Sequence, residues 1–190
     1  GQLVPSSTAA KAFAYRRGRS RTRDGEATVS YTPGHADDRI AILLNVYDAN
    51  NYLFLEAKGA GIASIQTVQG GTFTEAASAA PASVTLGVQY WLRGVRRGRL
   101  LVVEHWPQDP ALGGDVDPIL EHYLSSSDAA LFEDKGMAGF RFQPGSTAMR
   151  VNGFRCEPYS NAGIASADPS SPIGVRGDLQ ALTRAATVCF

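Results

Sequence analysis

Polar and aromatic side chains alternate along two neighbouring strand-like segments, 40–47 and 52–58. Alternate residues of a strand share a face, so the regular apolar positions mark a buried face and the remaining residues mark the opposite one. That opposite face combines rings, amides and charges, a mixture that stacks on sugar rings and hydrogen-bonds hydroxyl groups. The alternative is an ordinary solvated outer face. The predicted surface consists of Asn45, Tyr47, Tyr52, Phe54, Glu56 and Lys58.

A third strand-like segment, 100–106, adds Glu104 and Trp106, which alternation places on one side of it. If this strand joins the same sheet, Glu56 and Glu104 share a face. Two carboxylates are what a glycosidase needs, about 5–5.5 Å apart for retention or about 6.5–9.5 Å apart for inversion. A glycoside hydrolase or polysaccharide lyase that uses Glu56 and Glu104 is therefore one hypothesis. The Glu-x-Asp-x-x-Glu strand of sandwich-fold glucanases is absent, so we favour binding over catalysis and assign no catalytic residue.

Other patterns for catalysis or metal binding carry little weight in this sequence. There is no G-x-S-x-G motif, the three histidines lie in unrelated contexts, and His105 is expected to be a core or edge residue. The acidic loop 113–122 lacks the fixed spacing of a calcium loop and is expected to be solvated. Cys156 and Cys189 have no C-x-x-C spacing, and whether they pair is left open. We predict no metal site and no cofactor.

The charge balance limits the kinds of partner that the chain is expected to bind. Lys and Arg number 18, Asp and Glu also number 18, and this balance argues against a dedicated nucleic-acid binder. Arginines gather at 16–23, where they suit a charge-protected edge strand or, alternatively, a site for phosphate or an acidic glycan. No apolar run approaches the roughly 18 residues of a membrane span, and the first residues have no signal-peptide pattern, so we expect a soluble, mature or excised piece.

The order of elements predicts an all-β fold in one domain. Segments 90–95 and 100–107 read as two strands joined by an exposed arginine turn, with Trp91 in the core. Short helices are expected at 127–134 and 178–187. We predict a lead-in with a possible edge strand at 1–25, an antiparallel two-sheet β-sandwich of jelly-roll type at 26–158, and a flexible linker and tail at 159–190. Strands are expected at 27–32, 39–47, 52–58, 62–68, 83–86, 89–95, 100–106, 139–142 and 149–156.

Several motifs together resemble a known family. In order, they are NYLFLEAK, IQTVQGG, YWLRGVRRGRLLVVEHWP, GMAGFRF and MRVNGFRC. The series resembles concanavalin A-like lectin and glucanase domains of the laminin-G-like and keto-disaccharide-hydrolase-like kind, across about residues 26–158. Asn152 stands where that family often has an Asp, which weakens any acid-dependent role there. The resemblance implies a β-sandwich and a range of functions that includes glycan-binding modules, carbohydrate-active enzymes and receptor-binding parts of phage virions.

We therefore expect a non-catalytic module that recognises a carbohydrate, or an adhesive and structural domain of a larger assembly such as a phage virion or tail. Its expected partners are a glycan or other subunits, its expected location is extracellular or virion-associated, and an oligomer is possible. A third hypothesis is a purely structural domain that docks to neighbouring copies through Leu179 and Leu182 of the tail.

Overall fold

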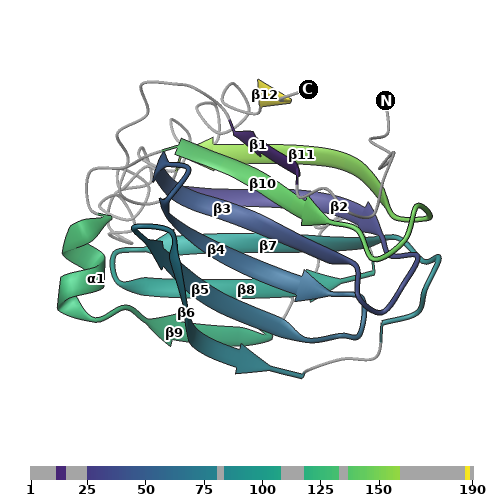
Figure 1. Cartoon of the computed structure of the whole chain (residues 1–190), viewed down its shortest axis with the longest axis horizontal. Coiled ribbons are helices and arrows are strands. Elements are labelled where there is room, and N and C mark those ends of the chain that lie inside the picture. The colour runs from purple at the N-terminus through teal and green to yellow at the C-terminus, as the bar shows by residue number, and fades with distance from the viewer. Residues whose placement is uncertain are drawn as a thin grey trace, which may run out of the picture.

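The alternating apolar residues fold into two six-stranded antiparallel sheets, packed face to face in a computed structural model (Figure 1). The structure describes residues 12–15, 25–80, 84–107, 118–132, 137–158 and 187–188. The front sheet has the order β1 (Ala12–Tyr15), β10 (Met137–Gln143), β3 (Arg39–Asp48), β4 (Asn51–Lys58), β5 (Ala63–Gln69) and β6 (Thr72–Ala79). The back sheet has the order β12 (Thr187–Val188), β11 (Arg150–Pro158), β2 (Gly25–Thr32), β7 (Tyr90–Arg97), β8 (Leu100–Trp106) and β9 (Leu120–Tyr123). One short helix, α1 (Ser126–Leu131), follows β9.

The predicted fold class, an all-β two-sheet sandwich with minor helices, is confirmed. The lead-in contributes β1, which pairs with β10 at one edge of the front sheet. The arginine segment 16–23, for which an edge strand or a phosphate site was expected, lies outside the described residues. The described part of 83–86 is not a strand, whereas β6 and β9 are strands that the sequence did not predict. The helix expected at 178–187, and Leu179 and Leu182 with it, lie outside the described residues, apart from Thr187, which is in β12.

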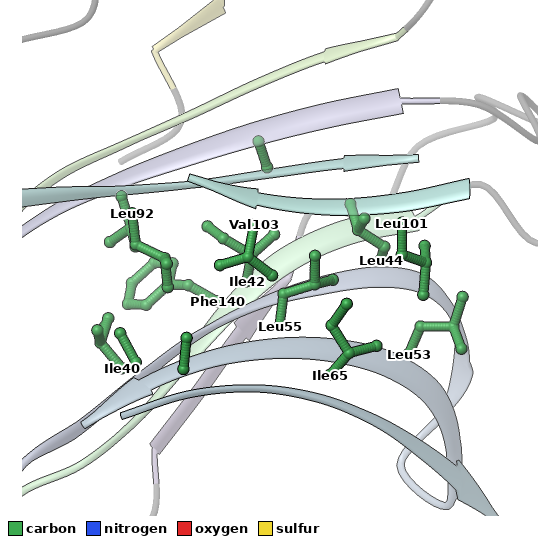
Figure 2. Close-up of a cluster of buried hydrophobic side chains, with 14 of the residues drawn as sticks. Ile40, Ile42, Leu44, Leu53, Leu55, Ile65, Leu92, Leu101, Val103 and Phe140 are labelled. Carbon is green, nitrogen blue, oxygen red and sulfur yellow. The ribbon is translucent and has the colours of Figure 1, made fainter. Parts of the chain in front are cut away.

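The hydrophobic core lies between the two sheets (Figure 2). Its side chains come from alternate positions of the central strands, and Ile42, Leu55 and Leu101 are almost wholly buried. Each such side chain contributes roughly 1.5–3 kcal/mol to stability by leaving water. At Gly94 the sheets approach so closely that a Cβ atom would lie 3.0 Å from Cγ2 of Ile42. The absence of a side chain there lets the sheets pack closely.

Two details of side-chain direction differ from the expectation. Asn45 has φ = 52° at an irregularity in the pairing of β3 with β4, and the pattern of alternation breaks there. Leu44 therefore belongs to the core between the sheets, while Val46 joins a separate cluster on the outer face of the front sheet. On β7, Trp91 pairs with Trp106 of β8 and faces outward, so the expectation of a core position for Trp91 is wrong.

Arg96, expected in an exposed turn, is fully buried. Its guanidinium donates to the carbonyl oxygens of Gly98 at 2.9 Å, Phe132 at 3.0 Å and Ala129 at 3.5 Å. The last two carbonyls belong to the end of α1, where carbonyl groups lack partners within the helix. Arg96 thus ties the helix to the β7–β8 turn.

Asp38 holds together two loops that cross between the sheets. One of its carboxylate oxygens accepts hydrogen bonds from the backbone N–H groups of Gly34 and His35, at 2.6 and 2.8 Å. The other oxygen accepts from Gly145 and Ser146, at 2.6 and 3.1 Å. The side chain is completely buried. The β2–β3 and β10–β11 connections are therefore joined by one charged group with four donors.

Replacing Asp38 by Asn should destabilise the fold by roughly 2–4 kcal/mol, because the amide carries no charge and turns one acceptor into a donor that faces N–H groups. Urea unfolding followed by circular dichroism measures the change. Asp37→Asn is the matched control, since the Asp37 side chain is 81% exposed and lies next to Asp38 in the chain. Equal effects of the two substitutions would contradict the role assigned to Asp38.

Candidate functional site

The residues of the predicted surface on β3 and β4 differ in how far they are exposed to solvent. Tyr52 and Glu56 lie on the outer face of the front sheet as expected, but each is only 2% exposed. Asn45 is also buried, whereas Tyr47 is 57% exposed at the end of β3. Lys58, at the end of β4, is half-buried. Of the predicted binding residues on this sheet, only Tyr47 and Lys58 are therefore open to a ligand.

An aromatic cluster of buried residues and the half-exposed Phe73 takes the place of the expected shelf. The guanidinium of Arg141, from β10, lies over the ring of Phe54 at 5.1 Å and over the ring of Phe73 at 5.7 Å. Phe73 meets Phe54 edge-on, with ring centroids 5.9 Å apart. Burial raises the pKa of Tyr52, and the neighbouring Arg141 partly opposes that shift. The face of the Phe54 ring is already in contact with a cation, an arrangement that stabilises the cluster.

Glu104 and Trp106 lie on the opposite side of the molecule from Glu56. They belong to β8 and face outward from the back sheet, because the alternate residues Leu101 and Val103 face the core. Packed sheets are about 10 Å apart, so outward-facing groups on the two sheets are separated by more than that. The hypothesis of a catalytic pair formed by Glu56 and Glu104 is therefore wrong.

Glu104 has a structural partner in its own sheet. Arg93 bridges two carboxylates, reaching Glu104 at 3.1 Å and Glu26 at 2.8 Å. Burial raises the pKa of Glu104, and Arg93 opposes this shift. The three side chains form a row across β2, β7 and β8 in which the guanidinium is already engaged.

The strands β6 and β9 lie near α1 at one edge of the sandwich (Figure 1). A pocket of about 590 Å³, called here the edge pocket, is lined by residues of these elements and of β5. It continues the space between the sheets beyond the apolar core. Leu53 faces the core and pairs with Thr67, so Thr67 and the alternate residue Gln69 also face inward. These inward positions are polar where the strand reaches the edge. The pocket is lined by Thr67, Gln69, Thr72, Thr74, Ala76, His122, Tyr123, Ser125 and Asp128.

Asp128 is held in place at the edge pocket by two side-chain donors. The amide of Gln69 donates to Oδ1 of Asp128 at 2.8 Å, and the hydroxyl of Ser125 donates to Oδ2 at 2.7 Å. Ser125 also caps α1, because its oxygen accepts from the backbone N–H of Asp128 at 3.0 Å. A carboxylate has about four acceptor positions, so Asp128 keeps capacity for the hydroxyl groups of a ligand. Tyr123, which is 67% exposed, borders the site; it pairs with Leu100 of β8, whereas His122 pairs with the core residue Leu101 and faces inward.

The edge pocket was not among the sites predicted from the sequence, although the residues of β5 and β6 carried a signal for it. Along β5 the inward positions run Ala63, Ile65, Thr67, Gln69, from apolar to polar. The paired positions Thr74 and Thr72 of β6 are polar as well. A change from apolar to polar on the inward face marks the point where an interior opens. Because β6 was not predicted as a strand, this pattern could not be assembled.

In the described ranges, no three side chains among His, Cys, Asp and Glu gather in a way that could hold a metal ion. No helix within the same ranges has the length and apolar character to cross a membrane. The Cys156 side chain and all of Cys189 lie outside the described structure.

The chain matches no family model and no curated protein. Among solved structures, chicken galectin 2 is 10% identical with a TM-score of 0.53, over 77% of this chain and 100% of that chain. A double mutant of congerin II is 9% identical with a TM-score of 0.54, over 77% and 100%. Toad ovary galectin in complex with thio-digalactose is 9% identical with a TM-score of 0.52, over 78% and 98%. The chain has the concanavalin A-like lectin fold. The resemblance seen in the sequence is confirmed at the level of the fold.

Within this β-sandwich, His105 is a core residue, as predicted, and not a base at a site. It is buried between the sheets, with its ring stacked on that of Tyr90 at 5.0 Å. Its Nε2 lies 2.9 Å from the hydroxyl of Tyr31, and burial raises the pKa of that hydroxyl. Burial lowers the pKa of His105 from 6.5 to about 4. The imidazole is therefore neutral at physiological pH.

The low pKa of His105 predicts that stability falls as the pH drops. Between pH 6.5 and about 4 the unfolded chain binds a proton at His105 that the folded protein does not, so the contribution is fully present above pH 6.5 and is lost on acidification. The loss amounts to at most ~3 kcal/mol. Urea unfolding at pH 7, 5.5 and 4 measures it. His105→Gln should show a shallower decline over this window, and a decline as steep as that of the wild type would contradict the assignment.

Proposed function

We propose that the chain is a non-catalytic carbohydrate-recognition module that holds its glycan in the edge pocket. The observation that carries the proposal is the lining of that pocket, where threonine hydroxyls, the Gln69 amide and the Asp128 carboxylate gather and the exposed Tyr123 borders the opening. Sugar hydroxyls both donate and accept hydrogen bonds, and the C–H face of a sugar packs on an aromatic ring. The volume of about 590 Å³ lies within the range of small-molecule sites.

The fold supports the same class of ligand. The toad ovary galectin, which shares the sandwich architecture, was solved with thio-digalactose, and a congerin II structure holds lactose. Because the identities are low, only the class of ligand, a saccharide, is proposed for this chain. The position of the pocket comes from the lining residues of this chain.

A glycan array followed by titration calorimetry tests the proposal. We expect saturable binding of at least one neutral glycan by the full chain. Tyr123→Ala should weaken that binding about tenfold or more, since stacking of this kind contributes roughly 1.5 kcal/mol. Asp128→Asn should also weaken it, because the amide nitrogen cannot accept a hydrogen bond from a hydroxyl group.

Tyr47→Ala is the matched control, because Tyr47 is a similarly exposed tyrosine outside the edge pocket. It should leave the affinity unchanged. Loss of binding in Tyr47→Ala together with normal binding in Tyr123→Ala would move the site to the front sheet, where the sequence first placed it. Absence of binding to any glycan would contradict carbohydrate recognition itself.

The setting of the module remains a prediction from the sequence. A larger assembly such as a phage virion or tail, and an extracellular or virion-associated location, are consistent with a recognition module. Binding of the full chain to intact cells, competed by the glycan found on the array, measures whether the module works as an adhesive domain.

A further inference from the structure

A second, smaller hollow lies on the outer face of the back sheet, and we call it the back-sheet hollow. Its volume is about 290 Å³. It opens over β11, β2 and β7, where Gly153, Ser30 and Trp91 lie side by side in register. The front-sheet residues and the edge pocket contribute nothing to its walls. The hollow is lined by Thr28, Ser30, Gln89, Trp91, Asn152, Gly153, Phe154 and Arg155.

The hollow exists because a glycine stands at its centre. The pairing of β11 with β2 shifts between Val151 and Gly153, and this irregularity places Gly153 beside Ser30. A Cβ atom at Gly153 would lie 3.4 Å from Oγ of Ser30, at ordinary contact distance. A larger side chain would therefore fit beside Ser30 without backbone strain and would fill part of the hollow.

The wall of the hollow contains a polar group whose hydrogen bonding is incomplete. The side-chain amide of Asn152 donates to Oγ1 of Thr32 at 3.2 Å. Its carbonyl oxygen, Oδ1, is buried and accepts no hydrogen bond. A buried acceptor without a donor costs free energy, which a donor entering the hollow would recover. Because this oxygen is itself buried, a ligand hydroxyl reaches it only if the Asn152 side chain rotates toward the hollow.

The charges around the hollow are already engaged. Arg93, two residues from Trp91 on the same face, is held by Glu26 and Glu104. Arg155, at the margin, has an interaction of its own. The groups that remain for a ligand are the hydroxyls of Thr28 and Ser30, the Asn152 carbonyl and the partly exposed Trp91 ring. This set matches the hydroxyl groups and the C–H face of an uncharged sugar.

We propose that the back-sheet hollow binds a single uncharged sugar ring, stacked on Trp91 over Gly153, with a hydroxyl donating to Oδ1 of Asn152. The site is separate from the edge pocket and does not depend on it. The two open on different surfaces of the molecule, so one module engages two saccharide units at once. Linked sites raise the overall affinity without any new contact.

Tryptophan fluorescence of the full chain tests the proposal. The chain has two tryptophans, Trp91 and Trp106, which pair across β7 and β8, and the edge pocket has none in its lining. The probes are the methyl glycosides of glucose, galactose, mannose and fucose, with methyl glucuronide as the charged comparison. At least one neutral probe should give a saturable change with a dissociation constant on the order of 1 mM, as expected for so small a ligand.

Variants separate this site from the edge pocket. Gly153→Val should abolish the saturable change, Asn152→Ala should weaken it severalfold, and Tyr123→Ala should leave it unchanged. Circular dichroism establishes whether each variant is folded. If Gly153→Val does not fold, the result with Asn152→Ala decides the test. The proposal would be overturned if no neutral probe gave a saturable change in fluorescence. It would also be overturned if a folded Gly153→Val variant, or Asn152→Ala in its place, bound the probe with wild-type affinity. Tighter binding of methyl glucuronide than of every neutral probe would overturn the assignment to an uncharged sugar. Loss of glycan binding by Tyr123→Ala in calorimetry would bear on the edge pocket and would leave the back-sheet hollow untouched.

Discussion

The sandwich depends on one buried carboxylate. Asp38 lies at the start of the front sheet, yet its four donors come from two loops that each carry the chain from one sheet to the other. Fixing both loops sets the pairing of β10 with β3 and of β11 with β2 at the same time. The close fit requires glycine, because a Cβ atom at Gly145 would lie 2.9 Å from that of Asp37. A charge so costly to bury is stable there because every acceptor position meets an N–H group.

Much of this fold could be read from the sequence, since alternation within a strand depends only on backbone geometry. The strands that were not predicted are those whose residues have a low intrinsic preference for strands but which pair with a neighbouring strand in the folded protein. Thr72–Ala79 contains three alanines and a glutamate, and Leu120–Tyr123 contains a glutamate, residues that are depleted in strands. Both segments are extended because a neighbouring strand supplies their hydrogen bonds. Edge strands of this kind are decided by tertiary pairing, which local sequence does not encode.

The candidate site was harder to predict for a different reason. Alternation correctly placed Glu104 and Trp106 on one side of their strand, but it cannot say to which sheet the strand belongs. It also cannot foresee a break such as the one at Asn45, where a single residue with positive φ turns Val46 outward. Sheet membership and strand irregularities depend on contacts between residues far apart in the chain, and those contacts decide which side chains meet.

Burial then decides which aromatic rings are able to bind. Phe54 and Tyr52 have the right chemistry for stacking on a sugar, but Arg141 lies over the Phe54 ring and both rings are buried. A guanidinium and a sugar compete for the same face of a ring, so a ring engaged by a cation is unavailable to a saccharide. Two other aromatic residues line a hollow: Tyr123, in the lining that includes Asp128, and Trp91, in the lining that includes Ser30 and Gly153. In both places a small or polar neighbour leaves space next to the ring, and that space, more than the ring itself, makes a binding site.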